Sequence, residues 1–272
     1  MIDFKSLFAR KKDPAAAAEP AAPVKESRFS KSLPSIPQFD FKRIFSGKKQ
    51  FVGLDIGSSS LKLVEMLGSP GAYTVNRFLM VPLARGVIVD GAVTDVDALA
   101  EAIKGLFLNS GCQKKEIVAS LSGHNVIIKK APFPQMEDKE LQETIRDEAG
   151  KYLPFDNMDD VNFDFQVLGP AAGNPNLNEV IIVAAKKEVM DGYVEAIELA
   201  GLSLAIMDVD SFALETMYME NYDYEENEVI VIANIGAGIT NLNVLQNATS
   251  IFTRDFTMGG NMITEAIESQ FG

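Results

Sequence analysis

The sequence is poor in the residues that build several common kinds of site. Its single cysteine, Cys112, excludes an internal disulfide and is typical of a reducing compartment. Its single histidine, His124, argues against a zinc site, and its place in an apparent turn favours a surface or packing role over a Ser-His-Asp triad. No apolar run approaches the roughly 18 residues of a membrane-spanning helix, and no signal-peptide pattern is present. We therefore expect a soluble, cytoplasmic protein.

Positive charge is scarce beyond the first 50 residues. Residues 1–50 hold 11 Lys/Arg and 5 Asp/Glu, and the 272-residue chain has a formal net charge of −13, so residues 51–272 carry −19. This negative charge on residues 51–272 argues against a groove that binds nucleic acid. The basic first segment suits contact with an anionic membrane surface or an acidic partner.

Residues 1–50 have the composition of a flexible extension. An Ala/Pro tract spans Asp13 to Pro23 and buries too little apolar surface to offset chain entropy. A short amphipathic repeat brackets the tract, DFKSLFARKK from Asp3 and DFKRIFSGKK from Asp40. The repeat is either a weak membrane-surface anchor or partner motif on a flexible segment, or its second copy is only the segment that precedes the first strand.

The stretch from Phe51 to Leu67, FVGLDIGSSSLKLVEML, predicts a strand, a tight turn and a second strand. The strand Phe51–Leu54 delivers Asp55 to its end, where its carboxylate suits Mg²⁺. The turn offers glycine, hydroxyls and successive amides to a phosphate, and a lysine follows within reach: Gly57, Ser58, Ser59, Ser60 and Lys62. It is not a P-loop, because GxxxxGK[ST] is missing. A solvated hairpin with a serine-rich turn is the alternative.

Strands and helices alternate along the next part of the chain, which predicts an α/β layer with helices packed on a mixed sheet. The acidic loop from Asn221 to Glu228 is a plausible domain boundary. The expected strands are 73–82, 116–121, 126–130, 161–168, 180–185 and 202–209, with helices over about 96–107 and 138–152, before Gly201 and from about Ser211.

The pattern of the opening hairpin returns in VIVIANIGAGITNLNVL, from Val229. A buried strand ends in Asn234, and a tight turn and an outgoing strand contain Gly236, Gly238 and Thr240. A third strand, Thr249 to Phe256, leads to Gly259, Gly260 and a helix from about Met262. Two such units predict two similar half-domains that clamp a phosphate chain from opposite sides.

With both turns in view, the chain resembles the actin-like ATPase superfamily, which includes FtsA, and within it the PilM family of type IV pilus assembly proteins. GLDIGSSSLKLVEM from Gly53 is similar to the first phosphate motif of that family, and KYLPFDNMDDVNFDFQVLG from Lys151 to its link from an inserted subdomain to the main sheet. ANIGAGITNLNV from Ala233 and FTRDFTMGGNMIT from Phe252 match its second half. The resemblance covers about residues 41–272.

The resemblance implies an α/β, actin-like (ribonuclease H-like) fold of two lobes. The first lobe would be residues 51–222, with an FtsA-type subdomain inserted at about 84–160. The second lobe would begin within 223–272 and stay incomplete at the C-terminus. Either the sequence is a fragment of a longer protein, or the adenine side of the site is missing and nucleotide affinity is poor.

The resemblance also implies ATP with Mg²⁺ between the lobes. Asp55 would hold the metal and its waters, Gly57 and Ser58–Ser60 would cradle phosphates, and Lys62 would reach the phosphate tail. The opposing side would be formed by Asn234, Gly236, Gly238, Thr240, Gly259 and Gly260.

The partner implied by the resemblance is the short cytoplasmic N-terminal peptide of PilN, an inner-membrane protein, bound in a groove between the first lobe and the insert. Other inner-membrane and motor components of the pilus machinery would be further partners. The chain would associate peripherally with the inner membrane through these partners. Self-association is a further option.

One departure from the family pattern affects the chemistry. Actin-like ATPases usually have Asp where this chain has Asn234, and an amide brings no negative charge to Mg²⁺ or to the attacking water. We therefore expect weak or absent hydrolysis and a scaffold without catalytic residues. Two alternatives stay open: an FtsA-like membrane-associated filament, and an ATPase or kinase that uses Asp208 or Asp210 as a base. Helix capping explains those two aspartates at least as well.

Overall fold

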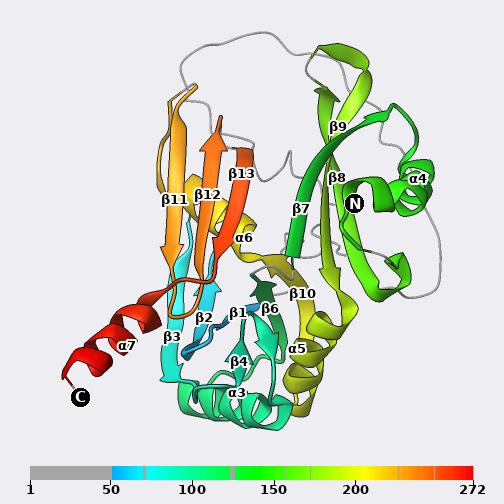
Figure 1. Cartoon of the computed structure of the whole chain (residues 1–272). Coiled ribbons are helices and arrows are strands. Elements are labelled where there is room, and N and C mark those ends of the chain that lie inside the picture. The colour runs from blue at the N-terminus through cyan, green and yellow to red at the C-terminus, as the bar shows by residue number, and fades with distance from the viewer. Residues whose placement is uncertain are drawn as a thin grey trace.

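A computed structural model describes residues 51–69, 72–122, 126–155, 157–171, 173–225, 227–247 and 249–271. The predictions for residues 1–50 and for His124 lie outside these ranges. Within them, the three larger of four sheets are arranged as a lower layer and two upper blocks (Figure 1), and the fourth is a two-stranded hairpin. None of the helices in these ranges combines the length and the apolar composition that a membrane span requires.

The lower layer is a mixed sheet with the strand order β10-β6-β1-β2-β3. The opening hairpin and the third strand form an antiparallel meander, while β6 and β10 join parallel to β1. Its strands are β1 (Val52–Ile56), β2 (Ser60–Leu67), β3 (Thr74–Pro82), β6 (Glu116–Leu121) and β10 (Ser203–Val209). The small hairpin of β4 (Ile88–Val89) and β5 (Ala92–Val93) precedes the first helix.

Two helices, α3 (Val96–Ser110) and α5 (Lys187–Leu199), cover one face of this sheet. Alternate apolar residues of β1 and of the first half of β2 are buried beneath them, as the period of two predicts, and Glu65 takes the next buried position of β2. Asp95 caps α3 by accepting a hydrogen bond from the Ala98 amide at 2.9 Å, and Gly111 ends it with φ of 66°.

The upper right block in Figure 1 is an inserted subdomain with its own core. It comprises β7 (Val126–Pro134), α4 (Asp138–Tyr152), a short 3₁₀ turn (Met158–Asp160), β8 (Val161–Ala171) and β9 (Asn174–Lys186), with the strand order β7-β9-β8. The insert predicted at about 84–160 does not match this unit. Residues 96–121 supply α3 and β6 to the lower layer, whereas β8 and β9 extend the insert to Lys186.

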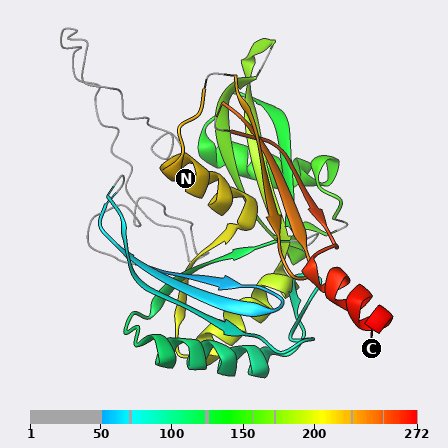
Figure 2. The same cartoon turned by 90° about the vertical axis from the view of Figure 1, so that its left-hand side faces the viewer.

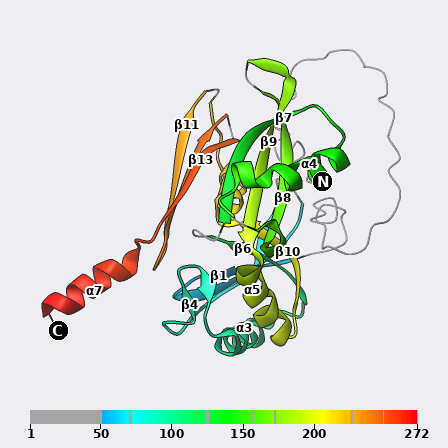
Figure 3. The same cartoon turned by 45° about the vertical axis from the view of Figure 1, so that its right-hand side comes forward.

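The upper left block is an antiparallel sheet of β11 (Val229–Ile235), β12 (Thr240–Gln246) and β13 (Thr249–Phe256). Helix α6 (Asp210–Asn221) follows β10 and packs against this sheet, so it joins the lower layer to the upper left block (Figure 2). Helix α7 (Gly260–Phe271) projects away from all three sheets, and none of its described residues is buried (Figure 3).

Candidate functional site

The first hairpin turn is tight because a backbone hydrogen bond closes it. The Gly57 amide donates to the Ser60 carbonyl at 3.1 Å, and the Ser59 carbonyl accepts from the Leu83 amide at 2.9 Å. A Cβ at position 57 would lie 3.1 Å from the Ser60 oxygen and 3.4 Å from Lys62 Nζ. Glycine at position 57 therefore lets the turn close beside the lysine.

The sequence predicted a strand over 51–54 with Asp55 at its end, but β1 continues to Ile56, so Asp55 lies inside the strand. It is the register partner of Lys62 on β2, so both side chains lie on one face of the sheet. Lys62 Nζ is 2.8 Å from Asp55 Oδ2, and the side chains are 34% and 54% exposed. The hairpin thus presents an accessible carboxylate and an accessible ammonium side by side.

The second hairpin repeats the backbone of the first. The Gly236 amide donates to the Ile239 carbonyl at 2.9 Å, the same three-residue closure. Asn234 is the register partner of Asn241, as Asp55 is of Lys62. The two hairpins therefore correspond position by position, but two amides replace the ion pair.

Gly259 and Gly260 brace this second turn from outside. The Gly260 amide donates to the Gly236 carbonyl and the Asn261 amide to the Ala237 carbonyl, each at 2.9 Å. A Cβ at position 259 would lie only 2.5 Å from the Ala237 oxygen. The Thr240 hydroxyl donates to the Met258 carbonyl at 2.6 Å. Within the described residues, the Gly260 amide and the Thr240 hydroxyl thus donate their hydrogen bonds to backbone carbonyls of the chain itself. A cofactor-binding role for Thr240, Gly259 and Gly260 stays a prediction.

The two turns meet. A Cβ at Gly238 would lie 3.2 Å from Ser58 Oγ, so glycine at this position allows the second turn to approach the serines of the first. Turns that are about 180 residues apart in the sequence thus lie in contact, and these turns together with Asp55, Lys62 and Asn234 of their flanking strands are called the joint site.

Asp210, at the start of α6, belongs to this neighbourhood. Its carboxylate accepts hydrogen bonds from Ser120 and Ser122, while burial raises its pKa and the charges of Asp55 and Asp255 raise it further. The capping interpretation fails for both Asp208 and Asp210: the N-cap residue is Val209, and α6 has no side-chain cap.

Asp208 is buried as well, and burial raises its pKa to about 6. Among the described residues, no group of three or more His, Cys, Asp or Glu side chains could hold a metal ion.

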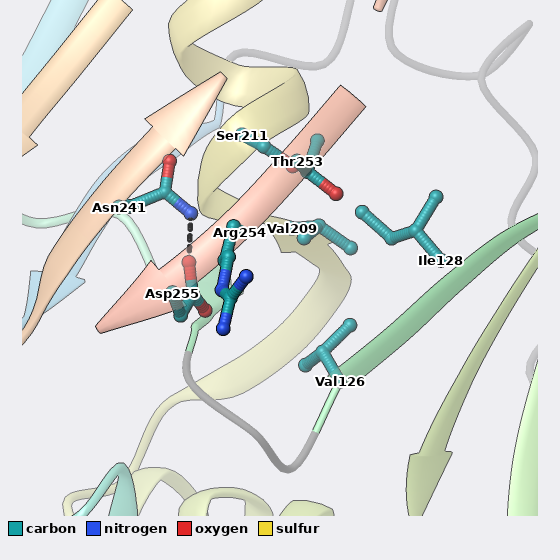
Figure 4. A pocket seen from close by; sticks show the side chains of 8 residues that line it. All are labelled: Val126, Ile128, Val209, Ser211, Asn241, Thr253, Arg254 and Asp255. Carbon is teal, nitrogen blue, oxygen red and sulfur yellow. Dashed lines mark hydrogen bonds between the residues drawn. The ribbon is translucent and has the colours of Figure 1, made fainter. Parts of the chain in front are cut away.

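A pocket of about 120 Å³ lies on the other side of the α6 start, where the three blocks converge (Figure 4). Its floor comes from β10 and α6, one wall from the insert and the other from the second sheet. The lining residues are Val126, Ile128, Val209, Ser211, Asn241, Thr253, Arg254 and Asp255.

Two buried polar atoms of this pocket lack hydrogen-bond partners within the described chain, Ser211 Oγ and Asn241 Oδ1. Ser211 is 1% exposed and Asn241 is 4% exposed. The amide nitrogen of Asn241 donates to Asp255 (Figure 4). Because an unsatisfied buried polar atom costs about 1–3 kcal/mol, a ligand that pairs with both atoms would recover that free energy. Sequence patterns could not reveal this pocket, because its residues come from five separate elements, β7, β10, α6, β12 and β13.

Below the pocket, a buried polar network ties α6 to the second sheet. Asn243, which is fully buried, donates from Nδ2 to the Ser211 carbonyl at 2.9 Å and accepts from Ser250 Oγ at 2.7 Å. Glu215 of α6 lies in the same network, and burial raises its pKa to about 7, although the Ser250 amide, the Lys130 charge and the Asn243 amide oppose the rise.

Comparison with known proteins agrees with the geometry. The model of the family described as "Type IV pilus assembly protein PilM" matches residues 53–272. A solved structure of a "PilM-PilN type IV pilus biogenesis complex" is 34% identical with a TM-score of 0.72, and the match covers 82% of this chain. The chain spans 66% of the length of that relative.

Two further solved structures are more distant. The cytoplasmic domain of EpsL, from the type II secretion system of Vibrio cholerae, is 11% identical (TM-score 0.49, covering 76% of this chain and 71% of that chain). The ethanolamine utilization protein EutJ from Carboxydothermus hydrogenoformans is 14% identical (TM-score 0.45, covering 87% and 62%). Neither supports an argument about the function of this chain.

The predicted fold class is confirmed: the chain has a mixed α/β, actin-like architecture with an inserted subdomain. The family model covers all four motifs on which the resemblance was based, including both hairpins. The chain therefore belongs to the PilM family of type IV pilus assembly proteins.

Proposed function

We propose that this chain is a cytoplasmic, nucleotide-binding scaffold of the type IV pilus inner-membrane assembly complex that binds the N-terminal peptide of PilN. The observation that carries the nucleotide part is the approach of Gly238 to Ser58, which joins two hairpins of equal design into one site. Membership of the PilM family and the likeness to a 34% identical chain from a PilM-PilN complex support the partner.

The residues of the joint site fit a Mg²⁺-triphosphate. Lys62 supplies a cation, and Asp55 supplies an exposed oxygen ligand 2.8 Å from it. The serine hydroxyls of residues 58–60 supply donors, while Gly57 lets the first turn close beside Lys62 and Gly238 lets the second turn approach Ser58. Bound Mg²⁺ would neutralise phosphate charge, while these groups would orient the phosphate chain.

Hydrolysis is expected to be slow because the second hairpin is uncharged. Asn234 and Asn241 bring no carboxylate to the metal or to an attacking water. Phosphate release by the parent and by Asn234→Asp tests this point. Brisk turnover by the parent would refute it, whereas faster release by the variant would support it.

The peptide part of the proposal uses the pocket at the start of α6. Its floor belongs to the first lobe and its wall, Val126 and Ile128, to the insert, which is where the family groove is expected. The apolar wall suits an aliphatic side chain, and the unpaired Ser211 and Asn241 atoms suit the polar groups of an extended peptide.

The test is fluorescence anisotropy with a labelled synthetic peptide of the PilN N-terminus. Micromolar binding that Ser211→Leu abolishes is expected, because leucine would fill the pocket. Leu108→Ala, on the exposed side of α3, is the matched control that should leave binding unchanged. Equal binding by the parent and by Ser211→Leu would remove the pocket from the proposal.

One observation favours an enzyme as a second candidate. Asp210 is buried, lies within the field of Asp55 and has a raised pKa, which are properties of a general base. If the chain were an ATPase or kinase, Asp210→Asn would abolish phosphate release that the parent shows at a measurable rate.

A further inference from the structure

Strand β3 is the edge strand of the lower layer, and one face of β2 and β3 is apolar and exposed within the described chain (Figure 1). The pairing of β2 with β3 places this face opposite Leu61 and Leu63, which are buried against the helices α3 and α5. Proteins commonly cover an exposed apolar edge of this kind. Its large exposed side chains, called here the edge strip, are Met66 (48%), Val75 (63%), Phe78 (64%) and Met80 (58%).

The chain enters the lower layer beside one end of the edge strip. Strand β1 begins at Val52, whose register partner on β2 is Glu65, the residue before Met66. The segment DFKRIFSGKK, residues 40–49, lies outside the described ranges and precedes this entry point by two residues. Because the tether is so short, the segment is held near the strip at a high effective concentration.

The apolar residues of segment 40–49 match the strip in spacing and in length. Phe41, Ile44 and Phe45 follow the i, i+3, i+4 pattern of one apolar helix face. In helical form ten residues are about 15 Å long, at about 1.5 Å per residue. From Val75 to Met80 the strip extends about 17 Å along β3, at about 3.4 Å per residue. One such segment is therefore long enough to cover the strip.

Charge complementarity gives the segment a direction. Residues 188–253 contain 12 Asp/Glu and no Lys or Arg. Burial and then the charge of Glu220, near the end of α6, raise the pKa of Tyr73, so Glu220 lies near the start of β3. This is also the end of the strip at which the chain enters. The basic end of the segment, Lys48 and Lys49, directly precedes that entry and would therefore face acidic side chains.

We propose that segment 40–49 of this chain docks on the edge strip, with Phe41, Ile44 and Phe45 against the strip and its basic end toward the end of α6. Docking removes apolar surface of both partners from water, which is the main favourable term in such a contact. The assignment gives the second copy of the repeat a role within the fold and leaves the first copy, residues 3–12, free. It requires neither a nucleotide nor a peptide.

Methionine oxidation by dilute hydrogen peroxide, read by mass spectrometry on the full chain, tests the proposal. Met80 and Met258 are 58% and 57% exposed, so they should oxidise at similar rates if nothing covers the strip. A segment that is docked in about nine of ten molecules slows the oxidation of Met80 about 10-fold relative to Met258. Equal rates for the two methionines in the parent chain would overturn the proposal.

The occupant is identified with Phe45→Glu, which should restore fast oxidation of Met80 because the strip offers a carboxylate no partner. Phe8→Glu, the same change in the first copy of the repeat, is the matched control and should keep the protection. Protection that survives in Phe45→Glu would overturn the assignment to segment 40–49. Protection that grows with the concentration of the chain would overturn it as well, in favour of a second copy of the protein.

Met207 reports whether each variant is folded, because it is 6% exposed and should oxidise slowly in a folded chain. If Phe45→Glu unfolds the chain, Phe45→Ser replaces it, with Phe8→Ser as its control and the same expected results.

The charge part of the proposal is tested by Glu220→Lys. Loss of an exposed attraction should speed the oxidation of Met80 roughly 2- to 5-fold. Glu195→Lys is the matched control, because Glu195 is an exposed glutamate of α5, the helix that covers the opposite face of the sheet. Equal rates for Met80 in the two variants would overturn the direction assigned to the segment.

Discussion

The two hairpins have the same backbone geometry, but the first presents an ion pair where the second presents two uncharged side chains. In the lower layer, Asp55 pairs with Lys62, while in the second sheet the corresponding positions hold two asparagines. Buried glutamates of the two regions differ in the same way. Glu65 of β2 is held by Lys114 and Arg77, whereas Glu215 under the second sheet has mainly neutral partners. Asp55 and Glu65 of the first region are thus paired with cations, whereas the second hairpin and Glu215 have mainly neutral polar partners.

This difference suits a scaffold better than a fast ATPase. Phosphate binding needs a cation and well-placed donors, which one charged hairpin and one uncharged, close-fitting turn can provide. Rapid hydrolysis needs charge placed from both sides of the phosphate chain, and the second hairpin has none.

The largest effect on stability is expected from a variant that breaks the ion pairs of Glu65 with Arg77 and Lys114 in the first region. Lys114 and Arg77, with Asn76, lower the pKa of Glu65 to about 2, so its carboxylate stabilises the fold above pH 4.5 and that stability is lost as pH falls towards 2. Glu65→Gln leaves two cations without their partner and should cost about 3 kcal/mol of unfolding free energy at pH 7. Urea denaturation measures it.

Glu101→Gln is the control for this variant, because Glu101 is 73% exposed in its pair with Lys104. Its effect should stay within about 0.5 kcal/mol. Equal losses of unfolding free energy in the two variants would show that the buried ion pairs of Glu65 stabilise the fold no more than an exposed pair does.

In the second region, the pH dependence should have the opposite sign. The folded pKa of Glu215, about 7, exceeds its unfolded value of 4.5, so the folded state binds the extra proton and stability falls as pH rises from 4.5 to 7. The loss over this window is up to about 3 kcal/mol for such a shift. Glu215→Gln should remove that part of the pH dependence in thermal unfolding monitored by circular dichroism, and an unchanged pH profile would contradict the assignment.

The charged side of the joint site is tested by Lys62→Ala. Loss of a charge-assisted contact of about 1.5–3 kcal/mol predicts a 10- to 150-fold weaker Mg-ATP affinity in isothermal titration calorimetry. Lys104→Ala, an exposed lysine on α3, should leave the affinity unchanged. If the two variants bind equally well, the first hairpin does not hold the phosphates.

A smaller effect is expected from Gly238→Ala on the uncharged side. Its Cβ would press on Ser58 Oγ at 3.2 Å, so the serine hydroxyl must move, and we expect Mg-ATP affinity to fall by about 10-fold, equivalent to about 1.4 kcal/mol. Ser58→Gly in the same chain should restore part of the loss. Additive single effects in this double-mutant cycle would show that the two turns act independently.

Much of the fold follows from local patterns in the sequence. Helix α4 spans Asp138–Tyr152 as its apolar spacing predicts, and β10 and α6 begin within a residue or so of the expected positions. The two hairpins were recognisable because glycine after an apolar strand has a specific conformational use. The insert was misplaced because β6 and β7 are both short apolar strands, and no local signal says that β6 pairs parallel with β1 while β7 pairs with β9.

The candidate site was predictable only in part, for a related reason. Asp55, Lys62, Gly236 and Gly238 stand in motifs, whereas the pocket depends on unpaired atoms of Ser211 and Asn241, which only tertiary packing brings together. The environment of Asp210 likewise depends on Ser120, which is 90 residues earlier in the chain.

The central claim is that both hairpins hold one triphosphate, and amide hydrogen exchange read by mass spectrometry tests it most directly. Peptides covering residues 57–60 and 236–239 should both gain protection as Mg-ATP is added, with the same midpoint concentration. Protection confined to one of the two turns, in a chain that binds Mg-ATP, would contradict the account.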